Sequence, residues 1–207
     1  MSPRPWLIVF AKAPRLGAAK RRLAREAGTL AAWRFYRRNS LDLLRRLGGD
    51  PRWGTVLAVT PDRDAAARFW PPELPRLAQG PGDLGHRMDR AMRRLPPGPV
   101  VLVGSDIPGI RRRHVAEAFR ALGRADAVFG PAADGGYWLV GLRRCPRMPQ
   151  LFEGVRWSSE HALADTLANL PRGMRHALLE ELSDVDTAAD LARIRASRRS
   201  RAPAAAG

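Results

Sequence analysis

Continuous runs of apolar residues recur along the chain and predict strands that are buried on both faces. The clearest are residues 6–11 (WLIVFA) and 100–103 (VVLV), which contain no charged side chain. Such runs are typical of the central strands of a parallel sheet, whereas half-exposed strands alternate apolar and polar residues. Further strands are predicted at residues 55–60, 76–79, 127–129, 137–140 and 176–182.

Segments with apolar residues at helical spacing separate these strands. Residues 18–47 predict a long helical region with a break near Gly28. Its apolar positions, spaced to lie on one side of a helix, are Leu30, Trp33, Leu41, Leu44 and Leu47. Shorter helices are predicted at residues 62–69, 83–95, 111–122, 158–170 and 187–196.

Strands and helices therefore alternate along the whole chain. This order predicts an α/β fold with right-handed crossovers, in which helices flank a mostly parallel sheet and ligands bind at the carboxyl ends of the strands. The length of 207 residues fits a single domain, which we expect over residues 1–196. Residues 197–207, rich in Arg, Ser, Pro and Ala, are expected to form a disordered tail.

The formal net charge of +16 permits two interpretations. One is a surface for phosphate-rich partners such as nucleic acid. The other is a coding bias toward arginine, since Lys12 and Lys20 are the only lysines and Ala, Gly and Pro are also abundant. We favour the second, because no nucleic-acid-binding motif is present. Nucleic acid is thus not the expected partner, although the charge can still attract a small anionic substrate.

Several classes of protein are disfavoured by what the chain does not contain. The single cysteine, Cys145, excludes an intramolecular disulfide and any site with several thiolates. Neither HExxH nor GxSxG occurs, so the chemistry of nucleophilic hydrolases is not indicated. No apolar run is long enough to span a membrane, and the first is too short for a signal peptide. A cytoplasmic protein is therefore expected.

Carboxylates at two places are candidates for a metal site. Asp106 directly follows the buried run at residues 100–103, at an edge where a carboxylate can hold Mg²⁺ or Mn²⁺. The alternative is that Asp106 only caps the next turn. Asp184 and Asp186 alternate in sequence, so an extended backbone would place both on one side, ready to share a cation. The alternative is that Asp186 begins the last helix as its N-cap.

The first loop places basic side chains between the first strand and the first helix. These side chains, which could surround an anion, belong to Lys12, Arg15, Lys20 and Arg22. Backbone N–H groups at the start of a helix also favour an anion such as a phosphate. The loop is not a Walker A motif, however, and a solvated basic helix is a serious alternative.

Three other segments carry weaker candidates, each with a plain structural alternative. Asp83 could act at a ligand or cap a helix, and Arg87 could contact a phosphate. In Asp134-Gly135-Gly136, the glycines permit close approach of a ligand, and Asp134 could orient a hydroxyl group or act as a base. Residues 157–158 could form an apolar wall and a polar cap for a ligand, although an aromatic residue is more often part of a core. The two residues are Trp157 and Ser158.

Taken together and in this order, these segments resemble a known family. The segments that carry the resemblance are residues 10–14, 17, 20–23, 82–88, 104–108, 130–137, 157–158 and 184–190. The match spans residues 6–195 and resembles the radical-SAM/selenodomain-associated transferases, also described as arsenosugar-biosynthesis-type glycosyltransferases. The chain is also similar to the molybdenum-cofactor and 2-phospho-lactate nucleotidyltransferases.

The resemblance implies a single-domain GT-A-like nucleotide-diphospho-sugar transferase fold. It also implies that Asp106 and Asp186 bind the metal ion and that Lys12, Lys20 and Arg22 hold phosphates. The chain departs from the family pattern where Arg21, His86 and Ala18 stand, in place of the usual Thr, Glu and Lys. These departures concern the choice of substrate and leave the carboxylates in place.

Two transferase activities and one binding function follow as hypotheses. The first is transfer of a sugar from a nucleotide-diphosphate donor to a small-molecule acceptor, with a metal-bound diphosphate leaving. Against it, residues 105–107 are not the Asp-x-Asp usual in such folds. The second is nucleotidyl transfer from an NTP to a small phosphorylated acceptor, with release of pyrophosphate. Against that, the first loop has no glycine-rich segment of the kind that binds a nucleotide. The third is a non-catalytic basic protein that binds nucleic acid.

Overall fold

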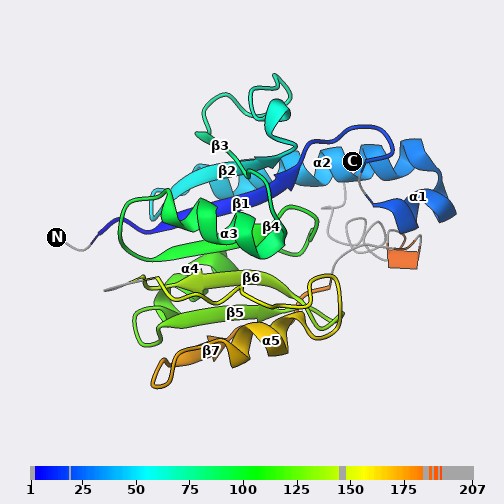
Figure 1. Cartoon of the computed structure of the whole chain (residues 1–207). Coiled ribbons are helices and arrows are strands. Elements are labelled where there is room, and N and C mark those ends of the chain that lie inside the picture. The colour runs from blue at the N-terminus through cyan, green and yellow to red at the C-terminus, as the bar shows by residue number, and fades with distance from the viewer. Residues whose placement is uncertain are drawn as a thin grey trace, which may run out of the picture.

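A computed structural model gives the fold and describes residues 3–18, 20–144, 148–183, 187, 189–190 and 192. Within these residues, strands form one seven-stranded sheet in the order β3-β2-β1-β4-β6-β5-β7 (Figure 1). The strands are β1 Trp6–Lys12, β2 Gly54–Thr60, β3 Arg76–Ala78, β4 Val100–Gly104, β5 Ala127–Pro131, β6 Tyr137–Leu142 and β7 His176–Leu178. The helices are α1 Arg21–Ala27, α2 Thr29–Gly48, the 3₁₀ helix η1 Asp62–Asp64, α3 Leu84–Arg93, α4 Arg112–Ala121 and α5 Ala162–Ala168.

The sheet is mostly parallel, which confirms the predicted α/β class. β1 pairs in parallel with β2 on one side and β4 on the other, and β2 pairs in parallel with β3. β6 is the exception among the described strands, because it is antiparallel to both β4 and β5. The reason is the short connection between β5 and β6, since a tight turn can join only antiparallel neighbours.

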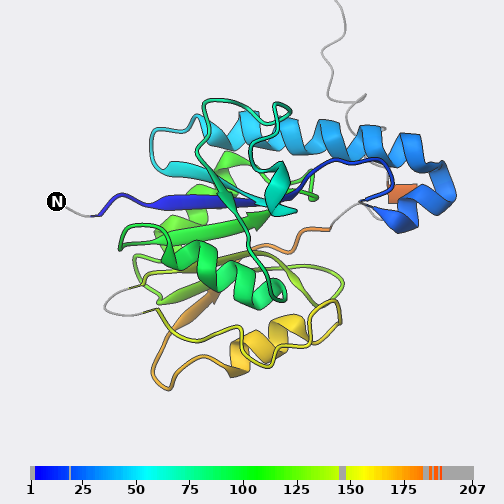
Figure 2. The ribbon, with the colours of Figure 1, turned by 45° about the horizontal axis from the view of Figure 1, so that its top comes forward.

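Two hydrophobic cores lie on opposite faces of the sheet, and Figure 2 shows helices on both of these faces. Alternate side chains of β1 enter different cores, with Leu7 and Val9 in one and Ile8 and Phe10 in the other. Helices α2 and α4 cover the first core, and α3 and α5 cover the second. Each buried aliphatic side chain contributes about 1.5–3 kcal/mol, so a strand covered on both faces must be apolar throughout.

Most predicted elements are present, but two predicted helices are too long. The helix expected at residues 158–170 begins only at Ala162, since Ser158 has φ 60°, which a right-handed helix does not allow. The segment at residues 62–69 forms only η1 and turns, in which Ala67 and Trp70 donate to the carbonyls of Asp64 and Ala67, three residues back. The break near Gly28 is present between α1 and α2.

Two further expectations concern the end of the chain and the membrane. The helix predicted at residues 187–196 falls largely outside the described residues, as do Cys145 and the tail at residues 197–207, so these stay predictions. None of the helices within the described residues has the length and apolar character needed to cross a bilayer.

Gly130 of β5 packs against a buried indole and offers a test of the second half of the sheet. A Cβ atom added at Gly130 would lie 2.3 Å from the Trp138 ring, which is only 2% exposed and cannot move aside. We expect Gly130→Ala to lower the free energy of unfolding by about 1–3 kcal/mol in urea titrations. Gly49→Ala is the control, because an added Cβ there meets nothing within 4 Å. Equal stability of the two variants would contradict this packing.

Candidate functional site

Three chain segments emerge together at one edge of the sheet. The parallel register places Lys12 beside Thr60 and Phe10 beside Gly104, so the segments after β1, β2 and β4 all leave the sheet at their carboxyl ends. Helix α1 lies beyond this edge, connected to β1 by the first loop (Figure 2). The edge therefore gathers the first loop and the segment that carries Asp106.

Lys20 and Asp106 form an ion pair at this edge. The Lys20 Nζ atom lies 3.3 Å from Asp106 Oδ2, and the exposed fractions of the two side chains are 6% and 44%. Lys20 is the N-cap of α1 and has a left-handed backbone, with φ 53° and ψ 52°. A left-handed backbone conformation is unfavourable for lysine, whereas glycine adopts it without steric strain. Because α1 has only seven residues, attraction of an anion there depends on side chains more than on the helix.

A buried polar network behind this pair was not predicted from the sequence. The Tyr36 hydroxyl group lies 3.0 Å from both the backbone N and the backbone O of Lys12, and 3.1 Å from Ser105 Oγ. Asn39 donates from Nδ2 to the carbonyl of Ser105 at 2.9 Å. Side chains of α2 thus fix the end of β1 relative to the residue that precedes Asp106.

The direction of these hydrogen bonds follows from counting protons. A tyrosine hydroxyl has one hydrogen and two lone pairs. The hydrogen goes to the Lys12 carbonyl, which can only accept, and one lone pair accepts the Lys12 N–H. Ser105 Oγ must then donate to the remaining lone pair. Burial is the main cause that raises the pKa of Tyr36, so the hydroxyl stays protonated at neutral pH.

The other predicted basic residues of the first loop occupy different positions. Arg15 makes a bidentate ion pair with Asp64, with Nε 2.7 Å from Oδ2 and Nη2 2.5 Å from Oδ1. The hydrogen bond from Arg15 lowers the pKa of Asp64, and the attraction between the two charges lowers it further. Lys12 and Arg22 are exposed, on the end of β1 and the first turn of α1. Their roles as phosphate ligands stay predictions.

Asp83 and Arg87 lie at the start of α3. Asp83 is the N-cap of that helix, and its Oδ1 accepts hydrogen bonds from the backbone N and the Nδ1 of His86 at 2.9 and 2.8 Å. Both hydrogen bonds lower the pKa of Asp83, and the bond from the His86 backbone has the larger effect. Arg87 donates from Nε to the Gly82 carbonyl at 2.7 Å. The capping alternative for Asp83 is therefore what the structure displays, and a ligand contact stays a prediction.

The turn between β5 and β6 is shaped by the backbone that packs on it. Gly135 has φ 80°, and an added Cβ would lie 2.2 Å from the carbonyl oxygen of Glu160. Asp134 accepts the Gly136 N–H at 3.1 Å through Oδ1 and is otherwise exposed. The close approach that Gly135 permits is therefore one within the protein. Asp134 and Gly136 remain candidates for contact with an acceptor.

Trp157 bridges α3 and the β6 strand. Its ring centroid lies 6.3 Å from those of both Tyr137 and Phe152, and it lies so close to Gly85 that an added Cβ would be 2.8 Å from it. Its buried Nε1 has no hydrogen-bond partner among the described residues. Trp157 is thus largely a packing residue, and the exposed Ser158 next to it has a left-handed backbone.

Part of the predicted metal site lies outside the described residues. Asp184 and Asp186 belong to that part, so their convergence with Asp106 stays a prediction. Within the described ranges, no three His, Cys, Asp or Glu residues gather closely enough to hold a metal ion. The Asp106 carboxylate, reachable from solvent at a strand end, is the kind of oxygen ligand that Mg²⁺ and Mn²⁺ prefer. It therefore fits one position of such a site.

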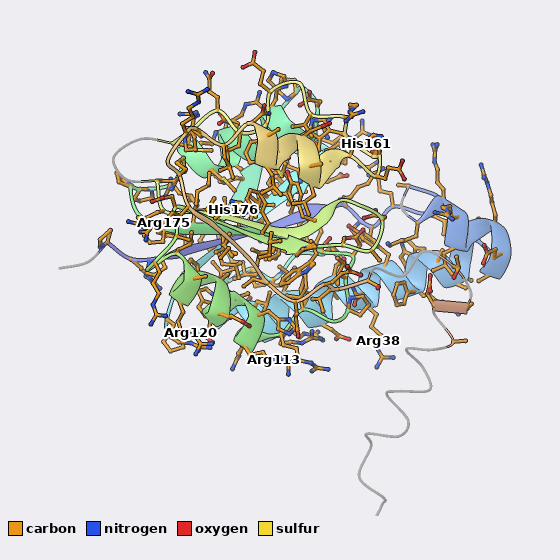
Figure 3. The ribbon with its side chains drawn as sticks, turned by 90° about the horizontal axis from the view of Figure 1, so that it is seen from below. Arg38, Arg113, Arg120, His161, Arg175 and His176 are labelled. Atoms are coloured by element: carbon orange, nitrogen blue, oxygen red, sulfur yellow. The ribbon has the colours of Figure 1, made fainter. Side chains whose placement is uncertain are left out.

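Positive charge is not confined to this edge. Figure 3 shows Arg38 of α2 and Arg113 and Arg120 of α4 along one rim of the molecule. Arg113 lies 3.4 Å from Glu180, and Arg38 lies 3.7 Å from Asp42. Arg120, which lies with Pro5 and Trp53 near the amino ends of β1 and β2, is remote from the first loop, in keeping with the coding-bias interpretation.

Comparison with known proteins places this fold among the nucleotide-diphospho-sugar transferases. A protein from Desulfovibrio desulfuricans G20, provisionally named as a nucleotide-diphospho-sugar transferase, is 31% identical with a TM-score of 0.86. The alignment covers 98% of this chain and 90% of that chain. The chain belongs to the family described as uncharacterized protein conserved in bacteria (DUF2064), which it matches over residues 43–159. The finer assignment to the radical-SAM-associated transferases stays a prediction.

Two more distant structures share the fold but little sequence. The 4-diphosphocytidyl-2C-methyl-D-erythritol synthase from Anaerococcus prevotii is 11% identical with a TM-score of 0.59, and the alignment covers 95% of this chain and 98% of that one. The mannosyltransferase PcManGT from Pyrobaculum calidifontis, in complex with GDP-Man and Mn²⁺, is 14% identical with a TM-score of 0.53. That alignment covers 89% of this chain and 57% of the mannosyltransferase. Comparison with the curated proteins gives no match.

The Tyr36 hydroxyl group can be tested by a single-atom deletion. Tyr36→Phe keeps the buried ring but leaves the Lys12 N–H and C=O without this partner. We expect the free energy of unfolding to fall by about 1–3 kcal/mol in urea titrations. Tyr137→Phe is the matched control, because among the described residues that hydroxyl group has one long hydrogen bond, of 3.4 Å, to Thr166. The assignment is wrong if Tyr137→Phe proves as costly as Tyr36→Phe.

The Arg15–Asp64 pair predicts a dependence of stability on pH. The pKa of Asp64 is lowered on folding, so its contribution is complete above the unfolded value of about 4 and is lost as the pH falls through the folded pKa. The difference in unfolding free energy between wild type and Asp64→Asn should therefore be constant from about pH 6 to 8 and shrink below about pH 4. Urea titrations at several pH values measure this difference. Arg15→Met should remove the same pH dependence, and a difference that persists in acid would contradict the assignment.

Proposed function

We propose that this protein is a metal-dependent glycosyltransferase that transfers a sugar from a nucleotide-diphosphate donor to a small-molecule acceptor. The observation that carries the proposal is the full-length likeness to the Desulfovibrio protein, at 31% identity. The Lys20–Asp106 pair at the carboxyl ends of β1 and β4 supports it, because ligands of open α/β sheets bind at that edge.

Each candidate residue has a role in this proposal. Asp106 would hold Mg²⁺ or Mn²⁺, with Asp184 and Asp186 as further ligands, and a cation bound there would neutralise charge on the departing diphosphate. Lys12, Lys20 and Arg22 would bind phosphate oxygens as point charges or hydrogen-bond donors. The attraction between these basic groups and the phosphates would be strongest where Tyr36 holds the backbone in place, because the protein there would need to rearrange less on binding.

The acceptor would approach from the β5–β6 turn. Asp134 is exposed there, and one of its oxygens is already held by the Gly136 N–H. The other Asp134 oxygen would accept a hydrogen bond from the acceptor hydroxyl group. It would take the hydroxyl proton as the acceptor oxygen attacks the anomeric carbon. The bond between that carbon and the diphosphate oxygen breaks, and the nucleoside diphosphate leaves with the electron pair.

Nucleotidyl transfer is the alternative, favoured by the likeness to the diphosphocytidyl-methylerythritol synthase. In that reaction an acceptor phosphate would attack the α-phosphorus of an NTP and release pyrophosphate. The two reactions would use the same cation and the same basic loop, so the released product distinguishes them.

The test is incubation of the protein and Mn²⁺ with a panel of NDP-sugars and NTPs and candidate acceptors. We expect release of a nucleoside diphosphate from one of the NDP-sugars, and loss of that release to background in Asp106→Asn. Release of pyrophosphate from an NTP would favour the alternative. Asp62→Asn is the matched control, since Asp62 follows the neighbouring strand β2 and its side chain accepts the Gly80 N–H. Nucleotide binding that ignores both EDTA and Asp106→Asn would refute the metal assignment.

A further inference from the structure

A cavity of about 760 Å³ lies against α3, apart from the first loop. Among the described residues that line it, none belongs to the first loop or to the segment that carries Asp106. We propose that this cavity is a second ligand site, which binds a small hydroxylated molecule with one anionic group. The proposal goes beyond the transferase function above and does not depend on it.

Two arginines that line the cavity are held in place by backbone carbonyls. Arg90 donates from Nη1 to the carbonyls of Gln79 and Pro81, both at 2.8 Å. Arg94 donates from Nη1 to the carbonyl of Ala78 at 3.1 Å. A carbonyl fixes the position of a guanidinium group but does not cancel its charge. Within the described part of the chain neither arginine is paired with a carboxylate, and each keeps further N–H donors for a ligand.

The two arginines differ in this respect from several others in the chain. Arg15, Arg52 and Arg156 each make a bidentate ion pair with an aspartate. Arg93, which lines the same cavity, donates from Nε to Asp89 Oδ2 at 2.6 Å. A coding bias toward arginine accounts for the number of such residues, but it does not account for a fixed pair of charges that lacks carboxylate partners.

The two uncompensated charges lie one helical turn apart near the end of α3. Like charges at positions i and i+4 destabilise a helix. The partial negative charge at the end of a helix can offset such a cost. The end of α3 is already served by Arg144, however, which donates to the carbonyls of Met92, Leu95 and Pro96. An anion bound between the two arginines would remove their repulsion and use the donors that remain.

The opposite end of the cavity, at the start of α3, offers hydrogen-bond acceptors. His86 Nδ1 lies 2.8 Å from Asp83 Oδ1, and an ionised carboxylate can only accept, so Nδ1 carries the hydrogen. The neutral ring then presents the lone pair of Nε2, and the His86 side chain is 71% exposed. Glu153 lines the same end, because Phe152 before it packs against Gly85.

These two ends define the chemistry of the ligand. A phosphate or carboxylate group fits beside Arg90 and Arg94, which can donate charge-assisted hydrogen bonds to it. The Glu153 carboxylate repels an anion from the other end, so the ligand would bind in one orientation. Hydroxyl groups fit that end, since they can donate to His86 Nε2 and to Glu153. The class of ligand is therefore a polyol or sugar that carries one phosphate or carboxylate group.

The experiment measures the binding of four probes by calorimetry at constant ionic strength, with EDTA present so that no divalent cation contributes. The probes are glycerol 3-phosphate, glycerate, glycerol and inorganic phosphate. We expect glycerol 3-phosphate or glycerate to bind and glycerol not to bind measurably, and the tighter of the two anions identifies the anionic group. Inorganic phosphate should bind about tenfold more weakly than glycerol 3-phosphate, because it lacks the carbon-bound hydroxyl groups. Equal affinity would overturn the assignment of hydroxyl groups to the His86 end.

Variants with effects of opposite sign protect the test against misfolding. Arg94→Met removes one uncompensated charge and should weaken the binding of the preferred anion about tenfold. Asp89→Asn should strengthen that binding, because Arg93 loses its carboxylate partner and can contact the anion. A misfolded variant would not bind more tightly. Arg120→Met is the matched control, since it removes the same charge from α4 and should leave the affinity almost unchanged.

Three results would overturn the proposal. Equal weakening in Arg94→Met and Arg120→Met would show that the anion responds only to the net charge of the protein. Weakening in Lys12→Met, with none in Arg94→Met, would place the anion at the first loop. Failure of wild type to bind any of the probes would exclude the cavity as a site of this kind. Each of these results leaves the transferase proposal in place, because the probes contain no nucleotide and the assay contains no metal ion.

Discussion

β1 is hydrogen-bonded on both sides to parallel strands, and the arrangement of the site edge follows from that pairing. With β2 on one side and β4 on the other, the segments after Lys12, Thr60 and Gly104 must leave the sheet at the same edge. The buried apolar side chains of β1 fix this register from two faces, since a shift by one residue would exchange the two cores. The position of Asp106 is thus set by packing far from any ligand.

Long helix α2 joins this framework to the polar edge. Its C-terminal half is buried through Leu43, Leu44 and Leu47, whereas Tyr36 and Asn39, nearer its start, are buried as polar residues. The same helix therefore belongs to the core at one end and to the site at the other. A rigid element of 20 residues that contacts both strand ends can keep basic and acidic groups in fixed relative positions before a ligand arrives.

The strands and the fold class could be predicted because continuous apolar runs and their alternation with helices are local properties of the sequence. The direction of β6 was not predicted, because its apolar run reads the same in either direction; the short turn at residues 132–136 decides it. The start of α5 was misplaced because Ser158 has a left-handed backbone, which its residue type does not indicate.

Single site residues could be named from their places at the ends of elements, but their partners could not. Lys20 and Asp106 were each expected at the edge, yet nothing in the sequence connects two residues so far apart. Tyr36 and Asn39 looked like ordinary helix residues, and their role became visible only beside Lys12 and Ser105. For Asp83 the local geometry supports the capping alternative. A carboxylate directly before a helix accepts hydrogen bonds from the N–H groups of its first turn.

The contact between Gly135 and the backbone of Glu160 joins the β5–β6 hairpin to the segment that precedes α5. There is no room for a side chain between them, and Leu163 at the start of α5 also donates its N–H to the Gly135 carbonyl at 3.0 Å. The hairpin is thus joined to the start of α5 through backbone atoms, whatever side chains the two segments carry. Any side chain at position 135 would push the two segments apart, so the placement of Asp134 in the turn depends on that one glycine.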